Sequence, residues 1–157
     1  MDNALSIYED FFGEREGENH SFSFFRKPIR NVEPLRCITI PDIYRYIVGP
    51  YAQRQTETLR AIIDKDAARK YKAENFDFCT FSGTFRIRNK SHLLLHSELL
   101  CIDFDHVADI PSLRERLLHD DCFETELLFR SPSGDGLKWV IDIERKGWEH
   151  SRFYNAV

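Results

Sequence analysis

The sequence predicts an α+β fold in which one sheet is faced by helices on one side. Apolar residues recur at helical spacing in the first half, as at Leu59, Ile62 and Ile63. From Asn75 onward, aromatic residues and Thr become frequent, and the pattern changes to one typical of strands. The chain of 157 residues is 42% hydrophobic and 13% aromatic, which is ample for the packed core of one domain.

The first half begins with a polar segment, residues 1–19, which we expect to be flexible or weakly docked. The predicted domain therefore covers residues 20–157. Its first elements are a strand, a polar connector containing Pro28 and Pro34, a short helix stopped by Gly49 and Pro50, and a longer region that forms one bent helix or two. The strand, the short helix and the longer region cover residues 20–26, 41–49 and 51–74.

The second half predicts strand, helix, strand, hairpin, strand and helix. Two strands lie on either side of Ser82-Gly83, and the run "HLLLHSELLCIDFD" is broken at Ser97 and Glu98. The strongest predicted strand is Leu99 to Asp105. A helix follows with Asp109 as its cap and Pro111 in its first turn. Two strands flank the turn "SPSGDG", and a last helix begins near Trp148 without a stop signal, which suggests a fragment of a longer protein.

Composition excludes several classes of protein. No apolar run has the roughly 18 to 20 residues of a membrane span, and the N-terminus lacks the apolar region of a signal peptide, so a cytoplasmic location is expected. The four cysteines have no C-x-x-C spacing, which predicts buried free thiols rather than zinc ligands or disulfides. They are Cys37, Cys79, Cys101 and Cys122.

Two carboxylates follow an apolar run in the strongest predicted strand. Since side chains alternate along a strand, Cys101, Asp103 and Asp105 share one face, while Ile102 and Phe104 point to the other. Like charges this close need compensation, and hard oxygen ligands suit Mg²⁺ or Mn²⁺. The alternative is a strand end with solvated acids.

The turn "RSPSGDGLK" could bind phosphate through its glycine-rich backbone and a nearby cation. Lys138 and Arg130 would supply the positive charge. The alternative is an ordinary hairpin with an outward-facing lysine. The combination of this turn with a preceding strand that ends in two acids favours a nucleotide site over the hairpin alone. The candidate nucleotide-binding residues are Arg130, Ser131, Ser133, Gly134, Gly136 and Lys138.

Basic side chains gather in two segments although the net charge is −4. Residues 54–72 carry six basic and three acidic side chains, and residues 84–92 carry three basic side chains and no acid. A nucleic acid could contact either segment, and a solvated helix face or a charged edge strand is the alternative. The candidate nucleic-acid-binding residues are Arg86, Arg88 and Lys90.

The motifs "CIDFDHV" and "FRSPSGDGLKWVI", in this order, resemble the catalytic core of the archaeo-eukaryotic primase superfamily, the primase-polymerases. The chain is most similar to the VirE N-terminal domain family of Bacteroides-type mobile elements, over residues 20–157. The resemblance implies an RRM-like antiparallel or mixed sheet with helices, preceded by an N-terminal α/β part. It also implies catalysis by Asp103, Asp105 and Lys138, with Asp103 and Asp105 holding the metal.

The resemblance implies a primase-polymerase-like domain that binds a nucleoside triphosphate, a divalent metal and single-stranded DNA during replication of a mobile element. A helicase domain in the same or another chain is an expected partner. Two departures stand out: Lys138 replaces a histidine of most members, and the third metal-binding acid should follow the last helix, so Asp142 is not assigned. A non-catalytic binding module serving a helicase, and a metal-dependent nuclease, remain alternatives.

Overall fold

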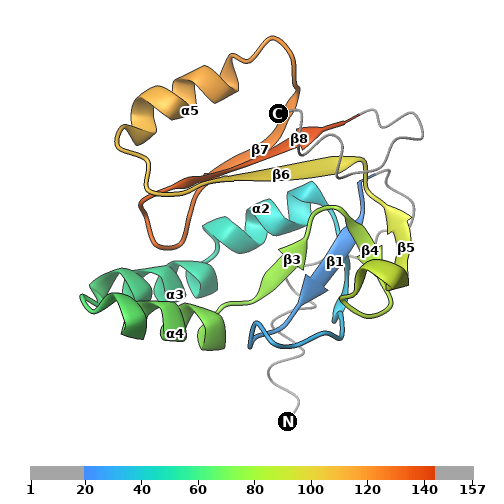
Figure 1. The fold of residues 1–157 in the computed structure, drawn as a ribbon, viewed down its shortest axis with the longest axis horizontal. Coiled ribbons are helices and arrows are strands. Elements are labelled where there is room, and N and C mark those ends of the chain that lie inside the picture. Colours follow the sequence, from blue (N-terminus) through green and yellow to red (C-terminus); the bar gives the residue numbers. More distant parts are fainter. Residues whose placement is uncertain (1–19, 144–157) are drawn as a thin grey trace.

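The computed structural model describes residues 20–143, which form three layers (Figure 1). Helix α5 covers one face of a three-stranded sheet, and the other face lies over helix α2 and a smaller sheet. The helices are α2 (Ile40–Val48), α3 (Pro50–Ala61), α4 (Lys65–Asn75) and α5 (Ile110–Leu118), with a 3₁₀ turn at Lys90–His92. The strands are β1 (Phe22–Phe25), β2 (Arg36–Ile38), β3 (Phe78–Thr80), β4 (Gly83–Phe85), β5 (Leu93–His96), β6 (Leu99–Phe104), β7 (Thr125–Arg130) and β8 (Leu137–Asp142).

All strand pairs among the described residues are antiparallel, and they form three small sheets with the orders β2-β1-β3, β4-β5 and β6-β8-β7. The prediction of a mixed α+β fold is therefore confirmed. The predicted single-sided sheet is wrong. Apolar residues of β6 and β8 alternate between two clusters, so the sheet needs cover on both faces.

The two clusters divide the core along β6 and β8. Leu99 and Val140 pack with Phe22, Phe24 and other residues of the smaller sheet and α2. The intervening side chains form the second cluster with Leu117 of α5: Leu100, Leu137, Trp139, Ile141 and Ile143. Alternate residues of the same strands thus enter two separate cores, as the period of two requires.

Local signals place the helix ends close to their predicted positions. Asp64 accepts a hydrogen bond from the backbone N–H of Ala67 at 2.7 Å, so α3 and α4 are two helices rather than one bent helix. Asp109 caps α5 through the N–H of Ser112 at 3.0 Å. The predicted connector contains an unpredicted strand, β2, which pairs with β1. The predicted last helix lies outside the described residues.

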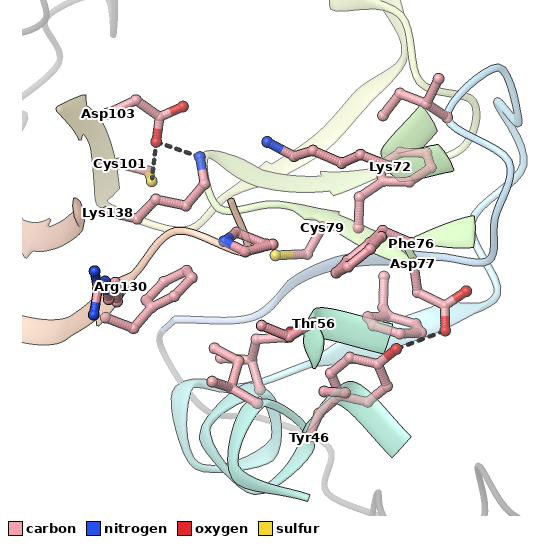
Figure 2. A pocket seen from close by; sticks show the side chains of 18 of the residues that line it. Tyr46, Thr56, Lys72, Phe76, Asp77, Cys79, Cys101, Asp103, Arg130 and Lys138 are labelled. Carbon is pink, nitrogen blue, oxygen red and sulfur yellow. Dashed lines mark hydrogen bonds and ion pairs between the residues drawn. The ribbon is translucent and has the colours of Figure 1, made fainter. Parts of the chain in front are cut away.

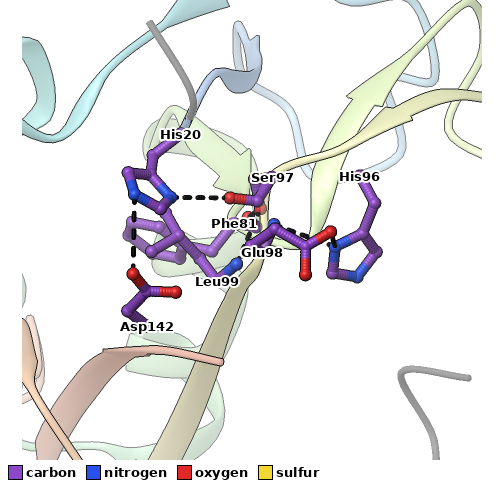
Figure 3. A network of polar contacts seen from close by, with 7 residues as sticks. All are labelled: His20, Phe81, His96, Ser97, Glu98, Leu99 and Asp142. Atoms are coloured by element: carbon purple, nitrogen blue, oxygen red, sulfur yellow. Dashed lines mark hydrogen bonds and ion pairs between the residues drawn. The ribbon is translucent and has the colours of Figure 1, made fainter. Parts of the chain in front are cut away.

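The break between β5 and β6 is held by a polar network (Figure 3). The hydroxyl of Ser97 donates to the Phe81 carbonyl and accepts the Leu99 N–H at 3.1 Å. Nδ1 of His20 lies 2.8 Å from the Ser97 carbonyl oxygen, and Nε2 lies 3.7 Å from the Asp142 carboxylate. Asp142 therefore stands at the opposite end of β8 from Lys138. Among residues 20–143, the model contains no helix with the length and apolarity of a transmembrane segment.

Candidate functional site

A cavity of about 1080 Å³ lies between helices α2 to α4 and one face of the β6-β8-β7 sheet (Figure 2). Its apolar wall includes Tyr46, Phe76 and Phe129. Charged side chains line the rest, and cations outnumber acids. The cations are Arg60, Arg69, Lys72, Arg130 and Lys138, and the acids are Glu57, Asp77 and Asp103.

The predicted alternation along β6 is present, and it directs Asp103 into the cavity. Cys101 and Asp103 line the cavity, whereas Ile102 and Phe104 pack in the α5 cluster. Asp105 follows the last residue of β6, is exposed and is not part of the cavity lining. Of the two predicted metal ligands, only Asp103 therefore faces the cavity.

Asp103 and Lys138 lie directly opposite each other on β6 and β8 and form an ion pair, with Nζ 2.5 Å from Oδ1. Figure 2 shows this contact at the cavity wall. The Lys138 side chain is 27% exposed and that of Asp103 is 51% exposed. A ligand phosphate that binds Lys138 would therefore compete with the Asp103 carboxylate for the ammonium group, or would share it with that carboxylate.

The turn between β7 and β8 lies against the end of β6, as the sequence predicts. The N–H of Ser131 donates to the Gly136 carbonyl at 2.8 Å, and Gly134 has a φ of 87° that favours glycine. A Cβ at Gly136 would lie 2.1 Å from the Phe104 carbonyl oxygen and 3.3 Å from the Asp105 Cα. This glycine is therefore required by the close approach of two backbones, whether or not a ligand binds.

Two arginines fasten the carbonyls of this turn, and one of them was not predicted. Arg60 of α3 donates through Nε to the Pro132 carbonyl at 3.0 Å and through Nη2 to the Ser131 carbonyl at 3.2 Å. Nε of Arg130 donates to the Gly134 carbonyl at 2.6 Å. The hydroxyls of Ser131 and Ser133 are 3.4 Å apart, and Ser131 is buried. No local sequence pattern predicts the Arg60 contacts, because Arg60 is 71 and 72 positions away from its two partners in the sequence.

Asp135, which lies in the turn itself, is another charged residue that the sequence analysis did not single out. Its carboxylate lies 2.8 Å from Nδ1 of His106, and the N–H of Val107 donates to its carbonyl at 2.8 Å. Slight burial acts to raise the pKa of Asp135, but hydrogen bonds from Ser133 and His106 outweigh it and lower this pKa. These contacts tie the turn to the segment after β6.

The predicted nucleic-acid residues do not line the cavity. Arg88 donates through Nη2 to the Ile29 carbonyl at 2.6 Å, and its guanidinium lies 4.7 Å from the centre of the Phe78 ring. Arg86 and Lys90 are exposed beside β4 and β5. The structure therefore separates this basic segment from Lys138 and the turn.

Two thiols face the cavity from β3 and β6. Burial raises the pKa of Cys79. Burial together with the Asp103 charge raises the pKa of Cys101 to about 12, and Lys138 acts in the opposite direction on both thiols. All four cysteines are free, as predicted. The prediction of burial is wrong for Cys37 and Cys122, which are exposed. Cys37 points outward because its neighbour on β2, Ile38, is the inward residue.

The donor set for a metal is small. Among residues 20–143, no group of three or more His, Cys, Asp or Glu side chains is arranged to hold a metal ion. Two carboxylates nevertheless suit Mg²⁺, which commonly binds one or two protein carboxylates and completes its shell with substrate phosphates and water. Of the two predicted ligands only Asp103 lines the cavity, so a metal there would need most of its ligands from a bound phosphate and from water.

These features define an α+β domain with a basic, partly apolar cavity. Residues 70–155 match the model of the family described as BT4734-like, N-terminal domain. The match covers more than half of the chain, so the chain belongs to this family. It supports the predicted membership in a Bacteroides-type family, and it includes β6, the turn and β8. The searches of curated proteins and of solved structures gave no match.

Proposed function

We propose that this chain is a primase-polymerase-like domain that binds a nucleoside triphosphate and single-stranded DNA in the replication of a mobile element. The observation that carries the proposal is the excess of cations in the cavity, five against three acids, in a chain whose net charge is −4. Because cations are concentrated in a concave site, a polyanionic ligand should bind there rather than on the remaining, more acidic surface. The apolar wall offers a surface for a base.

The phosphates would bind at the end of the cavity where Lys138 and Arg130 lie. Lys138 offers a point charge and Arg130 a planar guanidinium, and both types of side chain bind phosphate. The turn places Gly134 and Gly136 beside them, with Arg60 and Arg130 holding its carbonyls. This arrangement presents a fixed backbone to the ligand without requiring the turn to order on binding.

Mg²⁺ or Mn²⁺ would be held by Asp103 together with oxygen atoms of the bound triphosphate, and Asp105, which lies outside the cavity lining, would have to turn toward the metal to contribute. When bound, such a metal neutralises charge on the phosphates during phosphoryl transfer. Lys138 would then move from the Asp103 carboxylate to a phosphate oxygen, which leaves the carboxylate for the metal. Nucleotide and metal are therefore expected to bind with positive cooperativity.

A titration with a fluorescent dATP analogue in the presence of Mn²⁺ tests the proposal. Lys138→Ala and Arg130→Ala should each weaken binding about tenfold, since charge-assisted hydrogen bonds contribute about 1.5–3 kcal/mol each. Arg116→Ala is the matched control, because Arg116 is exposed on α5, which covers the opposite face of the sheet. Equal affinities in all four proteins would exclude the cavity as the nucleotide site.

The second candidate is a non-catalytic module that holds nucleotide or DNA for a helicase domain, and the Lys138–Asp103 ion pair favours it. A carboxylate neutralised by lysine attracts a metal less than an unpaired carboxylate does. A primer-synthesis assay on a single-stranded template with Mn²⁺ separates the two candidates. Product formation that is lost in Asp103→Ala supports catalysis, whereas tight binding without product supports the module. Template degradation that is lost in Asp103→Ala would instead indicate a nuclease.

A further inference from the structure

We infer that single-stranded DNA enters the cavity over the α3–α4 hairpin and contacts Arg69 and Lys72, rather than lying along Arg86, Arg88 and Lys90. The inference rests on the proposed function and specifies which surface the nucleic acid uses. It follows from the position of the two basic segments relative to the cavity, which the sequence alone does not give.

The hairpin contributes cations to the same cavity as the turn. Arg60 of α3 and Arg69 and Lys72 of α4 all line it. Arg60 also bonds the turn itself, so α3 and the β7–β8 hairpin are in direct contact. Figure 2 shows the Lys72 side chain extending along the cavity toward the wall that carries Lys138 and Asp103. A phosphate chain with one end at Lys138 would therefore meet Lys72 and Arg69 next.

The acids of the hairpin cancel only half of its positive charge, since residues 54–72 carry six basic and three acidic side chains. Of the three acids in residues 54–72, Asp64 is engaged as the cap of α4 and Glu57 accepts a hydrogen bond from Gln53. Asp66 lies 4.0 Å from Arg69, but both side chains are more than 80% exposed, so the pair is screened by water. The segment therefore keeps an excess of three positive charges, which suits a phosphate backbone.

The cavity also provides an aromatic surface beside these cations. Phe76 follows α4 directly and lines the cavity near Lys72, and its ring meets Tyr71 edge-on with the centroids 6.4 Å apart. Phe76 is partly exposed, so part of its ring is available for other contacts. Cations that follow the backbone and a ring on which a base can stack are the two components of single-strand binding sites.

The surface around Arg86, Arg88 and Lys90 is less suitable for a phosphate chain. Arg88 is committed to the Ile29 carbonyl and the Phe78 ring, and it holds the loop before β2 in place. The backbone N–H of Arg86 pairs with the His92 carbonyl, which puts it next to β5. Three consecutive leucines of β5 are between 41% and 67% exposed: Leu93, Leu94 and Leu95. A surface of exposed leucines with only Arg86 and Lys90 beside it matches a phosphate backbone poorly.

Fluorescence anisotropy of a labelled oligothymidylate, measured over a range of salt concentrations, tests the inference. The double variant Arg69→Gln/Lys72→Gln should weaken binding about tenfold and reduce the slope of log K against log salt by about 1.4, as expected for the loss of two phosphate contacts to a single strand. The double variant Arg86→Gln/Lys90→Gln should change affinity by less than about twofold, since it removes two charges outside the contact.

All four substituted residues are exposed, so loss of folding does not explain a difference between the two variants. Arg114→Gln/Arg116→Gln on α5 is the control for net charge alone, and it should match the unaltered chain. A larger loss in the Arg86/Lys90 variant than in the Arg69/Lys72 variant would overturn the inference. So would the absence of oligothymidylate binding in a chain that still binds the fluorescent dATP analogue, and the proposed nucleotide site would then stand. A chain that binds neither probe would overturn the proposed function itself.

Discussion

The two faces of the β6-β8-β7 sheet are built from alternate residues of the same strands, yet they differ in closure and charge. The face under α5 is mainly apolar and buries Leu100, Trp139 and Ile141. The opposite face is apolar at one end, where Leu99 and Val140 meet the smaller sheet. At its other end it carries charged groups and borders the cavity. The charged side chains that border the cavity are therefore confined to one end of one face, and the rest of the sheet supports them.

This difference explains why neighbouring residues of β8 should respond so differently to substitution. Trp139 is 3% exposed, donates through Nε1 to the Thr125 hydroxyl at 2.8 Å and meets the Phe123 ring edge-on. Lys138, one position before it, is partly exposed and pairs with a carboxylate that is half in water. Stability should depend on the first residue and ligand binding on the second.

The largest expected effect is on the free energy of unfolding of Trp139→Ala. The change removes a large buried ring and leaves a cavity, so it should cost about 3–5 kcal/mol. Lys138→Ala should cost less than about 1 kcal/mol, because the ion pair is screened by water. Urea denaturation followed by circular dichroism measures both. Equal losses in the two variants would show that the two faces do not divide stability and binding in this way.

An intermediate effect is expected at the point where the turn meets β6. In Gly136→Ala the new Cβ would lie 2.1 Å from the Phe104 carbonyl oxygen, so the turn must move away from β6. Such overpacking should lower stability by about 1–3 kcal/mol and should also weaken nucleotide binding. Thermal unfolding and the dATP-analogue titration check these outcomes. Ser133→Ala, on an exposed position of the same turn, is the control for thermal unfolding only, and a loss of stability as large as that of Gly136→Ala would point to a general sensitivity of the turn.

The strands that carry the site were predictable because their signal is local. Alternation along Leu99 to Phe104 separates Asp103 from Ile102 and Phe104 without any knowledge of the partner strand. The same applies to the Asp109 cap and to the break at Ser97. The order of the motifs suggested a shared site, and the turn does lie against Asp105 at the end of β6.

The contacts that give the site its form were not predictable, because they depend on register and on distant pairings. The ion pair between Asp103 and Lys138 requires that β6 and β8 be adjacent and aligned at these two residues. The hydrogen bonds from Arg60 to the turn require α3 to lie next to it. Strand β2 has only three residues, which is too short to stand out from its connector. The roles of Asp103, Asp105, Lys138 and the serines of the turn stay predictions.

The smallest expected effect concerns Cys101, which lies between the apolar and the charged ends of the cavity face. The thiolate is the nucleophile that attacks a disulfide reagent, and the pKa of about 12 leaves very little Cys101 thiolate at pH 8. Labelling at pH 8 should therefore be fast at the exposed Cys122 and slow at Cys101, and the rate at Cys101 should rise about tenfold per pH unit until the pH approaches its pKa. Cys101→Ser assigns the slow phase.

Substitutions of the neighbouring charges should move this rate in opposite directions. Burial is the main cause of the raised pKa, and the Asp103 charge adds to it, so Asp103→Asn should lower the pKa and speed labelling a few-fold. Lys138 acts to lower the pKa, so Lys138→Met should raise it and slow labelling. The measurement is the rate of release of the chromophoric thiol in stopped flow. Changes of the same sign in both variants would mean that the thiol responds to solvent entry after the ion pair breaks, and that the charged end of the face is less rigid than its hydrogen bonds suggest.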